Sequence, residues 1–303
     1  MKRAIITGAT GAVGTALINE LISNNIEVLV FCRENSKRND EIPKHPLVSI
    51  KYCDLSQLAG AENDTGKQYD VFYHFAWQGT TGADRNNMYM QNLNVKYALD
   101  AVGTAKRFGC KRFIGAGSQA EYGRMEGTLK PDTPVFPEMG YGMAKLCAGL
   151  MTREHAKALE LEHIWVRILS IYGPNDGAQS MVMSTVNKLR AGEIPQFTKG
   201  EQMWDYLYSG DAAKAFRLLG EKGVSGKTYV LGSGRVRPLA DYIEDIRRTV
   251  NDKAGVELGA IPYAEKQVMY LCADTSELEK DTGWSPVTDF TDGIKRIITG
   301  VYE

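Results

Sequence analysis

The glycine-rich run at residues 7–14, TGATGAVG, constrains the fold more than any other part of the chain. It follows a short apolar run, Ala4–Thr7, and opens a helical pattern over Ala12–Asn24. Glycine between a strand and a helix permits a tight turn, lets the backbone approach a pyrophosphate, and allows the helix to pack on the strand. The free N–H groups and the positive dipole end of that helix then bind phosphate. Although surface turns also collect glycines, this position predicts a dinucleotide-binding βαβ unit.

The rest of the first half alternates short apolar runs with longer helical patterns, which is typical of a parallel sheet. The apolar runs are nearly continuous, as expected of strands covered on both faces. The expected strands are Ala4–Thr7, Glu27–Cys32, Val48–Cys53, Val71–Phe75, Arg112–Ala116 and His163–Leu169. The expected helices are Ala12–Asn24, Asn86–Phe108 and Tyr141–Leu159. The predicted fold class is α/β, a Rossmann-type doubly wound parallel sheet.

A different organisation is expected after Tyr172, where the turn-forming run GPNDG at residues 173–177 takes the chain out of the sheet. The elements expected beyond it are a helix at Gly210–Lys222, a strand at Thr228–Leu231 that returns to the sheet, and helices at Leu239–Val250 and Asp289–Thr299. We therefore expect an NAD(P)-binding domain of residues 1–172 and about 208–232. A smaller, discontinuous C-terminal substrate-binding lobe is expected at about 173–207 and 233–303.

Composition and charge exclude several classes of partner. Of 303 residues, 43% are hydrophobic and 24% charged, as in a soluble globular enzyme. With 36 basic and 37 acidic side chains the formal net charge is −1, so we expect neither nucleic acid nor an anionic membrane as partner. No apolar run reaches the length of a membrane-spanning helix. The five cysteines form no CxxC pair and the four histidines have no zinc spacing, so we expect reduced thiols, no metal and a cytoplasmic location.

The end of the second expected strand bears on the choice between NADP and NAD. A carboxylate about 20 residues after the glycines would accept hydrogen bonds from the ribose of NAD and repel a 2′-phosphate. This chain has Cys32 there, followed by Arg33, with Lys37 and Arg38 close by. Because an arginine can bind a phosphate through two hydrogen bonds and stack on adenine, Arg33 favours NADP. The alternative is NAD, with Arg33 in solvent and Glu34 in place of the missing acid.

Tyr141 and Lys145, in the run YGMAK, are the candidate catalytic pair. Residues i and i+4 share one face of a helix, so both side chains are expected to project into one cleft. A free phenol titrates near pH ~10, and we expect the lysine ammonium to lower that pKa. Tyr141 then takes a proton from a substrate hydroxyl as hydride leaves for the nicotinamide, or donates one to a carbonyl in reverse. Ser118, at the end of the fifth strand, is expected to hydrogen-bond the reacting oxygen.

With these motifs in this order, the chain resembles the extended short-chain dehydrogenases/reductases of the NAD-dependent epimerase/dehydratase family, whose best-known members act on nucleotide sugars. The resemblance covers essentially the whole length. Besides TGATGAVG and YGMAK it rests on HFAW (74–77), Asn94-Val95, SQAEYG (118–123), Arg167 ahead of YGP (172–174), WDYLYSGDAAKA (204–215) and ADTSELEKDTGWSP (273–286).

The resemblance implies a nicotinamide cofactor and the positions around it. The family motifs place cofactor or catalysis at Gly8, Gly11, Gly14, Asp54, Ala76, Asn94, Tyr141 and Lys145. Further cofactor contacts are expected at Thr10, Ala12, Val13, Cys32, Arg33, Leu55, Phe75, Trp77, Ala116, Ile168 and Ile171. Asp54 is expected to bind the adenine amino group or, as an alternative, to cap a helix. Family members are commonly homodimers through a four-helix bundle, which the helices beginning near Asn86 and Tyr141 would supply.

The residues after Ser118 separate this chain from two subfamilies. In sugar-nucleotide 4,6-dehydratases an Asp-Glu pair directly follows the catalytic hydroxyl residue and supplies acid and base for the elimination of water. Here these positions hold Gln119 and Ala120, and Glu121, one residue late, is expected to point elsewhere. The deoxy-sugar epimerase-reductases use a cysteine directly after the serine, and Gln119 cannot replace it. We therefore expect redox chemistry at Tyr141, as a single reduction or as the oxidise-rotate-reduce cycle of a 4-epimerase.

Trp204 is a further departure from the family pattern, because many relatives have an arginine there that binds the substrate diphosphate. Tryptophan can stack on a base or a sugar but cannot neutralise phosphate. We expect Arg235 or Arg237 to supply the positive charge that Trp204 lacks. The alternative is that both arginines are surface residues. Trp77 is expected to line the cleft, with core packing as the alternative. The expected substrate contacts are Gln78, Ser118, Gln119, Asn175, Trp204 and Arg235.

The leading hypothesis from the sequence is an NADP-preferring ketoreductase or 4-epimerase of a nucleotide-linked sugar. One alternative is a reductase of a small carbonyl compound without a nucleotide, which Trp204 would tolerate better. The other is a non-catalytic NADP-binding sensor or scaffold, against which the retained Tyr141 and Lys145 argue.

Overall fold

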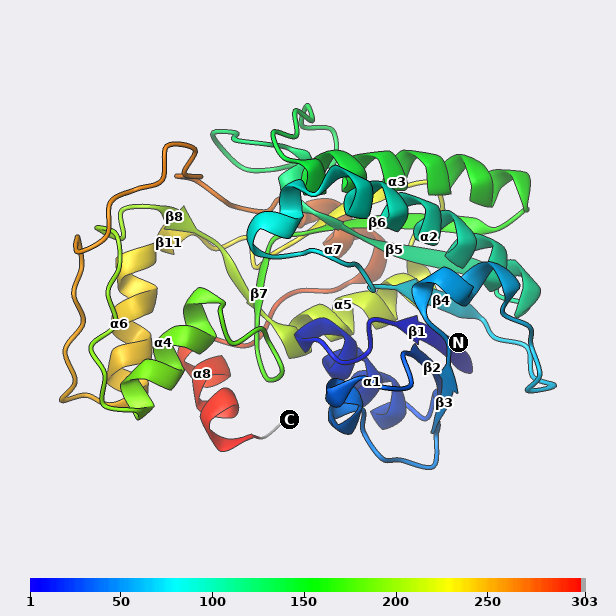
Figure 1. Ribbon diagram of the computed structural model, residues 1–303, viewed down its shortest axis with the longest axis horizontal. Helices are drawn as coiled ribbons and strands as arrows, with labels where there is room; N and C mark the ends of the chain where they lie inside the picture. Colours follow the sequence, from blue (N-terminus) through cyan, green and yellow to red (C-terminus); the bar gives the residue numbers. More distant parts are fainter. Residues whose placement is uncertain (301–303) are drawn as a thin grey trace.

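The computed structural model describes residues 1–300 and has a Rossmann-type α/β architecture around one parallel sheet (Figure 1). Seven strands lie in the order β10-β6-β5-β4-β1-β2-β3, and every neighbouring pair is parallel. They are β1 (Arg3–Thr7), β2 (Glu27–Cys32), β3 (Val48–Tyr52), β4 (Val71–His74), β5 (Arg112–Ser118), β6 (Glu162–Ile168) and β10 (Thr228–Leu231). Both the predicted fold class and the expected return of residues 228–231 to the sheet are confirmed.

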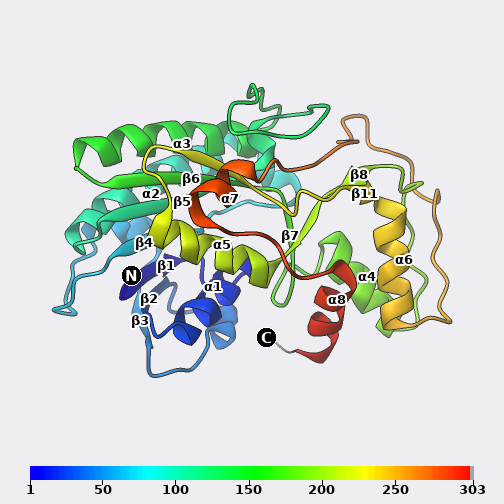
Figure 2. The ribbon, with the colours of Figure 1, turned by 180° about the vertical axis from the view of Figure 1, so that it is seen from behind.

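Five α-helices cover the two faces of the sheet (Figures 1 and 2). They are α1 (Ala12–Ser23), α2 (Met88–Arg107), α3 (Gly140–Ala158), α5 (Ser209–Lys222) and α7 (Ser276–Thr282). Helices α1, α5 and α7 pack in one apolar cluster with the sheet, and α2 packs in the cluster on the opposite face, beside α3. Because chain connections run to opposite sides of β1, the sheet reverses its order between β1 and β4, where doubly wound folds bind ligands.

The remaining elements form a second region beside the sheet, here called the small lobe, which consists of α4, α6, α8, β8 and β11 (Figure 1). Their bounds are α4 (Met181–Arg190), α6 (Leu239–Val250), α8 (Phe290–Thr299), β8 (Met203–Trp204) and β11 (Arg237–Pro238). A parallel pair, β7 (Ser170–Tyr172) and β9 (Tyr206–Tyr208), connects it to the sheet region. The helices expected near the C-terminus are confirmed, whereas α4 and α7 were not predicted.

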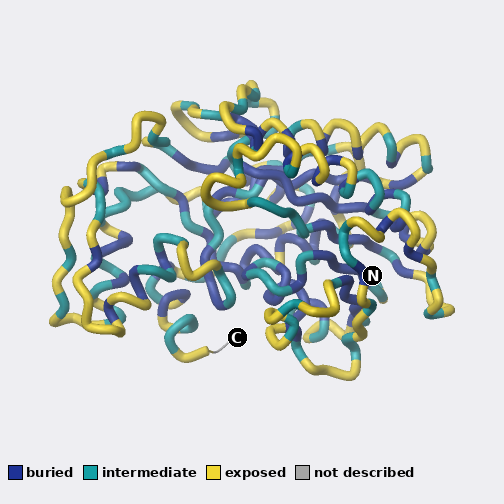
Figure 3. The backbone as a smooth tube through the Cα atoms, viewed as in Figure 1, coloured by how far each residue is buried: buried dark blue, intermediate teal, exposed yellow. Residues whose placement is uncertain are grey.

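Burial is concentrated in the sheet, as Figure 3 shows. The side chains of β4 are all buried, while β3 at the sheet edge exposes 42% of Ile50 and 57% of Tyr52. The expectation that the strands are covered on both faces therefore fails at β3, because no further strand or helix packs outside it among the described residues.

Four short 3-10 helices complete the described chain: η1 (Lys37–Glu41), η2 (Leu55–Gly60), η3 (Gly82–Asn86) and η4 (Gln119–Glu121). Each follows a strand of the sheet, so these turns lie where the carboxyl ends of the strands meet. Within residues 1–300, none of the helices combines the length and the apolar character that crossing a membrane requires. Over the same residues, no three His, Cys, Asp or Glu side chains are grouped to hold a metal ion.

Candidate active site

The glycine-rich loop between β1 and α1 has the geometry of a phosphate cradle. Gly8 has φ +75°, and a Cβ there would lie 2.6 Å from the backbone nitrogen of Ala76. A Cβ on Gly14 would lie 2.3 Å from the carbonyl oxygen of Gly8, so this glycine allows α1 to pack on the loop. Gly11 faces open space and begins α1 without a side-chain cap. The first N–H groups of α1 are therefore directed at an open position, as phosphate binding requires.

A cavity of about 640 Å³ begins at this loop and extends along the carboxyl ends of the neighbouring strands. Eleven of the residues expected at the site line it: Gly8, Thr10, Gly11, Cys32, Arg33, Asp54, Leu55, Phe75, Ala76, Trp77 and Gln78. A glycine cradle at one position and an elongated polar cavity beside it fit a dinucleotide. We call this space the dinucleotide cavity.

Several residues expected to contact a cofactor support the cavity instead of lining it. Val13, Ile168 and Ile171 pack against the apolar core between the sheet and helices α1 and α5. Asn94 is buried, and its amide holds the backbone of Gln78 through two hydrogen bonds of 2.9 Å. These four residues do not line the dinucleotide cavity, and Asn94 holds the backbone of Gln78, which does. Ala12 and Ala116 are also buried and lie outside the cavity wall.

Asp54 has the capping role that the sequence left open. Its Oδ1 accepts hydrogen bonds of 3.0 Å from the backbone and the hydroxyl of Ser56, and Gln57 completes a capping box at η2. The same residue still lines the dinucleotide cavity. Capping and a contact with bound ligand are therefore compatible at this position.

Arg38 makes a contact that sequence reasoning did not identify. Its Nη2 donates to the carbonyl oxygen of Thr10 at 2.6 Å and to that of Asn175 at 2.8 Å. Thr10 belongs to the glycine-rich loop, and Asn175, with φ +62°, belongs to the turn that leads to the small lobe. Arg38 thus links the two regions beside the dinucleotide cavity, which it also lines.

The structure brings Tyr141, Lys145 and Ser118 together where β5 ends and α3 begins. The Ser118 hydroxyl lies near enough to the phenol of Tyr141 to help lower its pKa. The ammonium of Lys145 is buried, donates to the carbonyl oxygen of Ala116 at 2.7 Å and lies 3.8 Å from the ring centroid of Trp77. The ring of Tyr141 meets that of Trp77 edge to face at 6.2 Å. Trp77 therefore joins the catalytic pair to the dinucleotide cavity, and its Nε1 is held by Gln91 at 2.8 Å.

The electrostatics of the pair differ from the sequence-based expectation. Burial raises the pKa of Tyr141, while the hydroxyl of Ser118 and the guanidinium of Arg85 lower it and Glu121 raises it. Burial also lowers the pKa of Lys145 to about 7, although the carboxylate of Glu121 favours its charged form. The net shift of the Tyr141 pKa is upward through burial, Lys145 is not among the groups that lower it, and the ammonium of Lys145 faces Trp77 and the carbonyl oxygen of Ala116.

Glu121 points away from the position that an elimination catalyst would occupy. Its side chain is fully buried, and Oε1 accepts from the backbone N–H of Ser118 at 2.8 Å and from Nε1 of Trp165 at 3.0 Å. Its Oε2 accepts from Nε of Arg167 at 2.8 Å. Together these bonds hold the end of β5 against β6. The Glu121 carboxylate therefore stabilises the carboxyl end of β5, which contains Ser118.

The residues expected to contact substrate are spread over two regions. Gln119 begins η4, half-buried beside Ser118. Trp204 donates from Nε1 to the hydroxyl of Ser170 at 2.8 Å and packs in the small lobe. The side chain of Arg235 is 63% exposed and lies 3.4 Å from Asp289.

Arg237, the alternative to Arg235, pairs with Asp245 at 2.9 Å and stacks on Tyr242. Of the two arginines, Arg235 is thus the freer to meet a ligand. Within the described residues neither lines the dinucleotide cavity.

A comparison with known proteins agrees with this architecture. The model of the NAD dependent epimerase/dehydratase family matches residues 4–232. The dTDP-4-dehydro-6-deoxyglucose reductase of Escherichia coli is 26% identical over 98% of this chain and 96% of its own length. Other relatives matching along nearly the whole chain are dTDP-glucose 4,6-dehydratases.

Solved structures share the fold over the same length. UDP-glucuronic acid 4-epimerase of Bacillus cereus, in complex with UDP-glucuronic acid and NAD, superposes with a TM-score of 0.85 at 18% identity, covering 98% of this chain and 99% of the epimerase. RMD of Pseudomonas aeruginosa, complexed with NADPH, has a TM-score of 0.82 at 16% identity, covering 99% and 98%. With its glycine cradle, its Ser118, Tyr141 and Lys145 constellation and the family match over most of its length, this chain belongs to the NAD dependent epimerase/dehydratase family of extended short-chain dehydrogenases/reductases.

Proposed function

We propose that this protein is an NAD(P)-dependent ketoreductase or 4-epimerase of a nucleotide-linked sugar. The observation that carries the proposal is the position of Tyr141, whose phenol lies near the hydroxyl of Ser118 and whose ring meets Trp77 on the wall of the dinucleotide cavity. Relatives described as a dTDP-4-dehydro-6-deoxyglucose reductase and a UDP-glucose 4-epimerase support the substrate class.

The proton chemistry follows from the raised pKa of Tyr141. A nicotinamide cofactor in the dinucleotide cavity would supply or accept a hydride. Tyr141 is protonated at neutral pH, so it can donate its proton to a substrate carbonyl oxygen that Ser118 aligns. In the oxidising direction the phenol must first lose that proton, which the raised pKa opposes. This asymmetry favours reduction over the oxidative half of an epimerase cycle.

Elimination of water is not part of the proposal, although dehydratases are among the relatives. The two positions after Ser118 are Gln119 and Ala120, neither of which can transfer a proton at neutral pH. The one nearby carboxylate on the same turn, Glu121, is occupied by Ser118, Trp165 and Arg167.

The nucleotide portion of the substrate is the least constrained part of the proposal. Trp204 is half-buried, with its indole N–H bonded to Ser170 and its ring packed in the small lobe, and the exposed Arg235 is the candidate phosphate contact. A small carbonyl compound without a nucleotide is the alternative substrate, because Trp204 does not supply a positive charge.

NADP is the proposed cofactor, with NAD as the alternative. An adjoining cavity of about 610 Å³ lies beyond Cys32. It is lined by three cations, Arg33, Lys37 and Arg38, and by two carboxylates, Glu34 and Asp54. Three cations against two carboxylates favour an added phosphate. Calorimetric titration should show tighter binding of NADP than of NAD, and Arg33→Ala should reduce the difference. Tighter NAD binding by the wild-type protein would contradict this choice.

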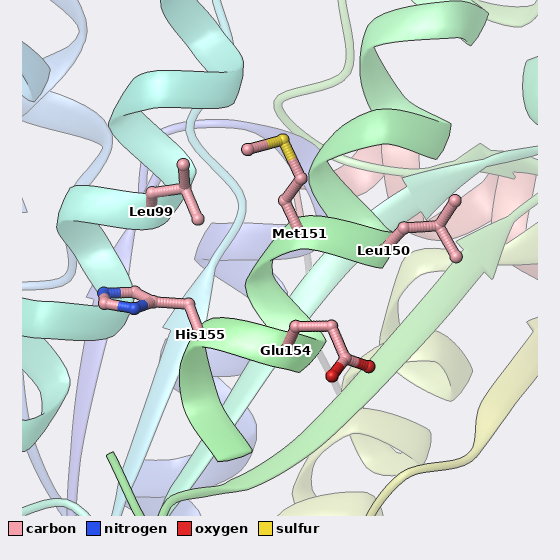
Figure 4. Close-up of a pocket in the computed structure, with 5 residues that line it drawn as sticks. All are labelled: Leu99, Leu150, Met151, Glu154 and His155. Atoms are coloured by element: carbon pink, nitrogen blue, oxygen red, sulfur yellow. The ribbon is translucent and has the colours of Figure 1, made fainter. Parts of the chain in front are cut away.

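A homodimer through α2 and α3 is the proposed assembly. These helices expose apolar side chains on one side of the molecule, with Tyr89 88% and Met88 54% exposed, together with Leu93, Met143, Leu150 and Met151. A shallow groove of about 490 Å³ runs between them, and Figure 4 shows Leu99 of α2 with Met151 and His155 of α3 around it. An apolar face of this kind is covered in most soluble proteins, and two such helix pairs would form the four-helix bundle of the family resemblance. Light scattering should give twice the chain mass, and Leu150→Glu should give the chain mass.

Turnover by Tyr141→Phe tests the catalytic proposal. UDP- and dTDP-linked 4-keto-6-deoxyhexoses are incubated with wild-type protein and NADPH or NADH, and the corresponding hexoses with NAD+ or NADP+. Loss of the proton donor should lower kcat by about 100- to 10,000-fold, whereas Tyr97→Phe on α2 should not change it. Unchanged turnover by Tyr141→Phe would overturn the catalytic assignment. If the wild-type protein converts none of these sugars but reduces small ketones, the alternative substrate is correct.

A further inference from the structure

At the candidate active site two neighbouring aromatic rings, Tyr141 and Trp77, lie between two cations, Arg85 and Lys145. The guanidinium carbon of Arg85 lies 4.3 Å from the ring centroid of Tyr141. That ring meets Trp77 edge to face, and the ammonium of Lys145 lies 3.8 Å from the Trp77 centroid. Lys145 is 5.8 Å from the Tyr141 centroid, farther than Arg85. Of these two cations, Arg85 is thus the nearer to the centre of the Tyr141 ring, although the sequence motif supplies Lys145.

We propose that Arg85 is a positioning residue of the reaction and the cation that chiefly favours the ionised form of Tyr141. Lys145 is directed instead at Trp77 and at the carbonyl oxygen of Ala116. This inference deepens the proposed function, because it concerns the same proton donor. It assigns to η3, which contains no family motif, a part in the proton transfer.

The loop that contains Arg85 is fastened on several sides. Arg85 Nη1 donates to the carbonyl oxygen of Thr80 at 3.1 Å. The amide of Gln91 donates to the carbonyl oxygens of Gly79 at 2.8 Å and Asp84 at 3.0 Å. These bonds tie residues 79–85 to α2, so the guanidinium is delivered by a fixed turn and not by a freely rotating surface side chain.

The same loop also fixes the start of the catalytic helix. Oδ1 of Asn86 accepts the backbone N–H of Gly140 at 3.0 Å. A Cβ on Gly140 would lie 3.1 Å from the carbonyl oxygen of Arg85 and 2.7 Å from the sulfur of Met88, so glycine is needed for this close approach. The turn therefore sets both the position of the Tyr141 ring and the charge above it.

The groups facing Tyr141 account for the direction of the effect. Burial raises its pKa, the hydroxyl of Ser118 and the charge of Arg85 lower it, and the carboxylate of Glu121 raises it. Lys145, on the same helix, is the remaining cation near the ring. An arginine stays charged at every pH at which the protein is folded, whereas the buried Lys145 has its pKa lowered to about 7.

A fluorinated tyrosine at position 141 alone tests this inference without substrate or cofactor. Its more acidic phenol titrates within the pH range of the folded protein, and fluorine NMR reports that one site. Arg85→Gln and Arg85→Met should each raise the pKa of the probe by about one unit, since an opposite charge at this distance shifts a pKa by roughly 1–3 units. Arg85→Lys should shift it by less, and Arg248→Gln on α6 should leave it unchanged.

The outcome separates this inference from the proposed function. An unchanged probe pKa in a folded neutral variant of Arg85, judged by its thermal unfolding midpoint, would overturn the proposal. A larger shift in Lys145→Met than in the Arg85 variants would also overturn it, because Lys145 would then be the dominant cation. Since the titration needs no turnover, it can succeed even where the sugar substrates fail.

Discussion

The sheet region and the small lobe achieve stability in different ways. In the sheet, buried strands such as β1 and β4 are continuous runs whose backbone groups are paired on both sides, and helices cover both faces. The small lobe has only two-residue strands, and its core is a cluster of aromatic rings from distant parts of the chain. The ring centroid of Phe290 lies 4.7 Å from that of Tyr172 and 4.6 Å from that of Tyr242. The ring centroids of Tyr206 and Tyr242 are 5.1 Å apart.

This difference shows where rigidity is placed in the molecule. Ser118 and the glycine-rich loop lie at ends of buried strands, so the residues proposed for cofactor binding and proton transfer are held by the sheet. The small lobe depends on side chains that meet only after the chain has folded. We expect perturbations of the sheet to remove stability and site together, and perturbations of the lobe to spare cofactor binding.

The largest effect is expected from Glu121→Gln in the sheet region. The substitution leaves the guanidinium of Arg167 buried beside a neutral amide, and breaking a buried ion pair costs about 3–5 kcal/mol in free energy of unfolding. Denaturant unfolding measures the change. Glu138→Gln, whose partner Arg124 is exposed, is the control and should leave stability nearly unchanged. Equal stability of the two variants would show that the buried pair does not hold β5 to β6.

A smaller effect, confined to one region, is expected from Phe290→Ala. Removing this ring opens a cavity among Tyr172, Tyr206 and Tyr242 and should lower the free energy of unfolding by about 3 kcal/mol. Hydrogen exchange should increase in α6 and α8, while the dissociation constant for the nicotinamide cofactor stays within about twofold of wild type. Val287→Ala, 69% exposed, is the control. A parallel loss of cofactor affinity would mean that the two regions are not separable.

Lys145→Met tests the cost of burying a cation in the sheet region. The folded pKa of Lys145 is about 7, below the ordinary lysine pKa of 10.5, so between these values the unfolded chain holds a proton that the folded chain has released. Stability therefore rises with pH in this window, by at most about 1.4 kcal/mol per pH unit. Between pH 7 and 8 the free energy of unfolding of Lys145→Met should rise by roughly 1 kcal/mol less than that of the wild type. Lys188→Met on α4 should show the same rise as the wild type. An identical pH dependence in wild type and Lys145→Met would contradict the lowered pKa.

The smallest effect is expected from Arg38→Gln, which removes the link between the regions. Two hydrogen bonds to Thr10 and Asn175 are lost from an exposed side chain, so stability should fall by only about 1 kcal/mol. Hydrogen exchange in residues 173–177 should nevertheless increase, because this turn loses its connection to the glycine-rich loop. Lys37→Gln, on the same turn, is the control. Unchanged exchange in that turn would show that Arg38 does not couple the regions.

The contrast also explains what the sequence could predict. Strands and glycine-rich loop were found because their signals are local: continuous apolar runs, and glycines where Gly8 and Gly14 make close backbone contacts. Helices α4 and α7 were missed, since their short apolar faces have meaning only against distant partners such as the aromatic cluster. Fold class and the Ser118, Tyr141 and Lys145 grouping were thus accessible from the sequence.

The arrangement of charge within the site was not accessible in the same way. An i to i+4 spacing places Tyr141 and Lys145 on one helical face. It does not reveal that the Lys145 ammonium contacts the ring of Trp77. Arg85 and Arg38 lie in turns without periodicity, so their contacts with Tyr141, Thr10 and Asn175 depend on tertiary folding. The sequence carries no local signal for either contact.

The most direct test of the central claim is the mass of the product formed from a nucleotide sugar with deuterated NADPH. The 4-keto-6-deoxy derivatives are incubated with the protein and deuterated NADPH, the UDP- and dTDP-linked hexoses with the protein and NAD+ or NADP+, and the products are analysed by mass spectrometry and NMR. Redox chemistry at Tyr141 predicts a reduced product that carries deuterium at the former carbonyl carbon, or an epimer of unchanged mass. A product lighter by one water would contradict the account, because it would require the elimination chemistry for which Gln119, Ala120 and the occupied Glu121 provide no acid and base.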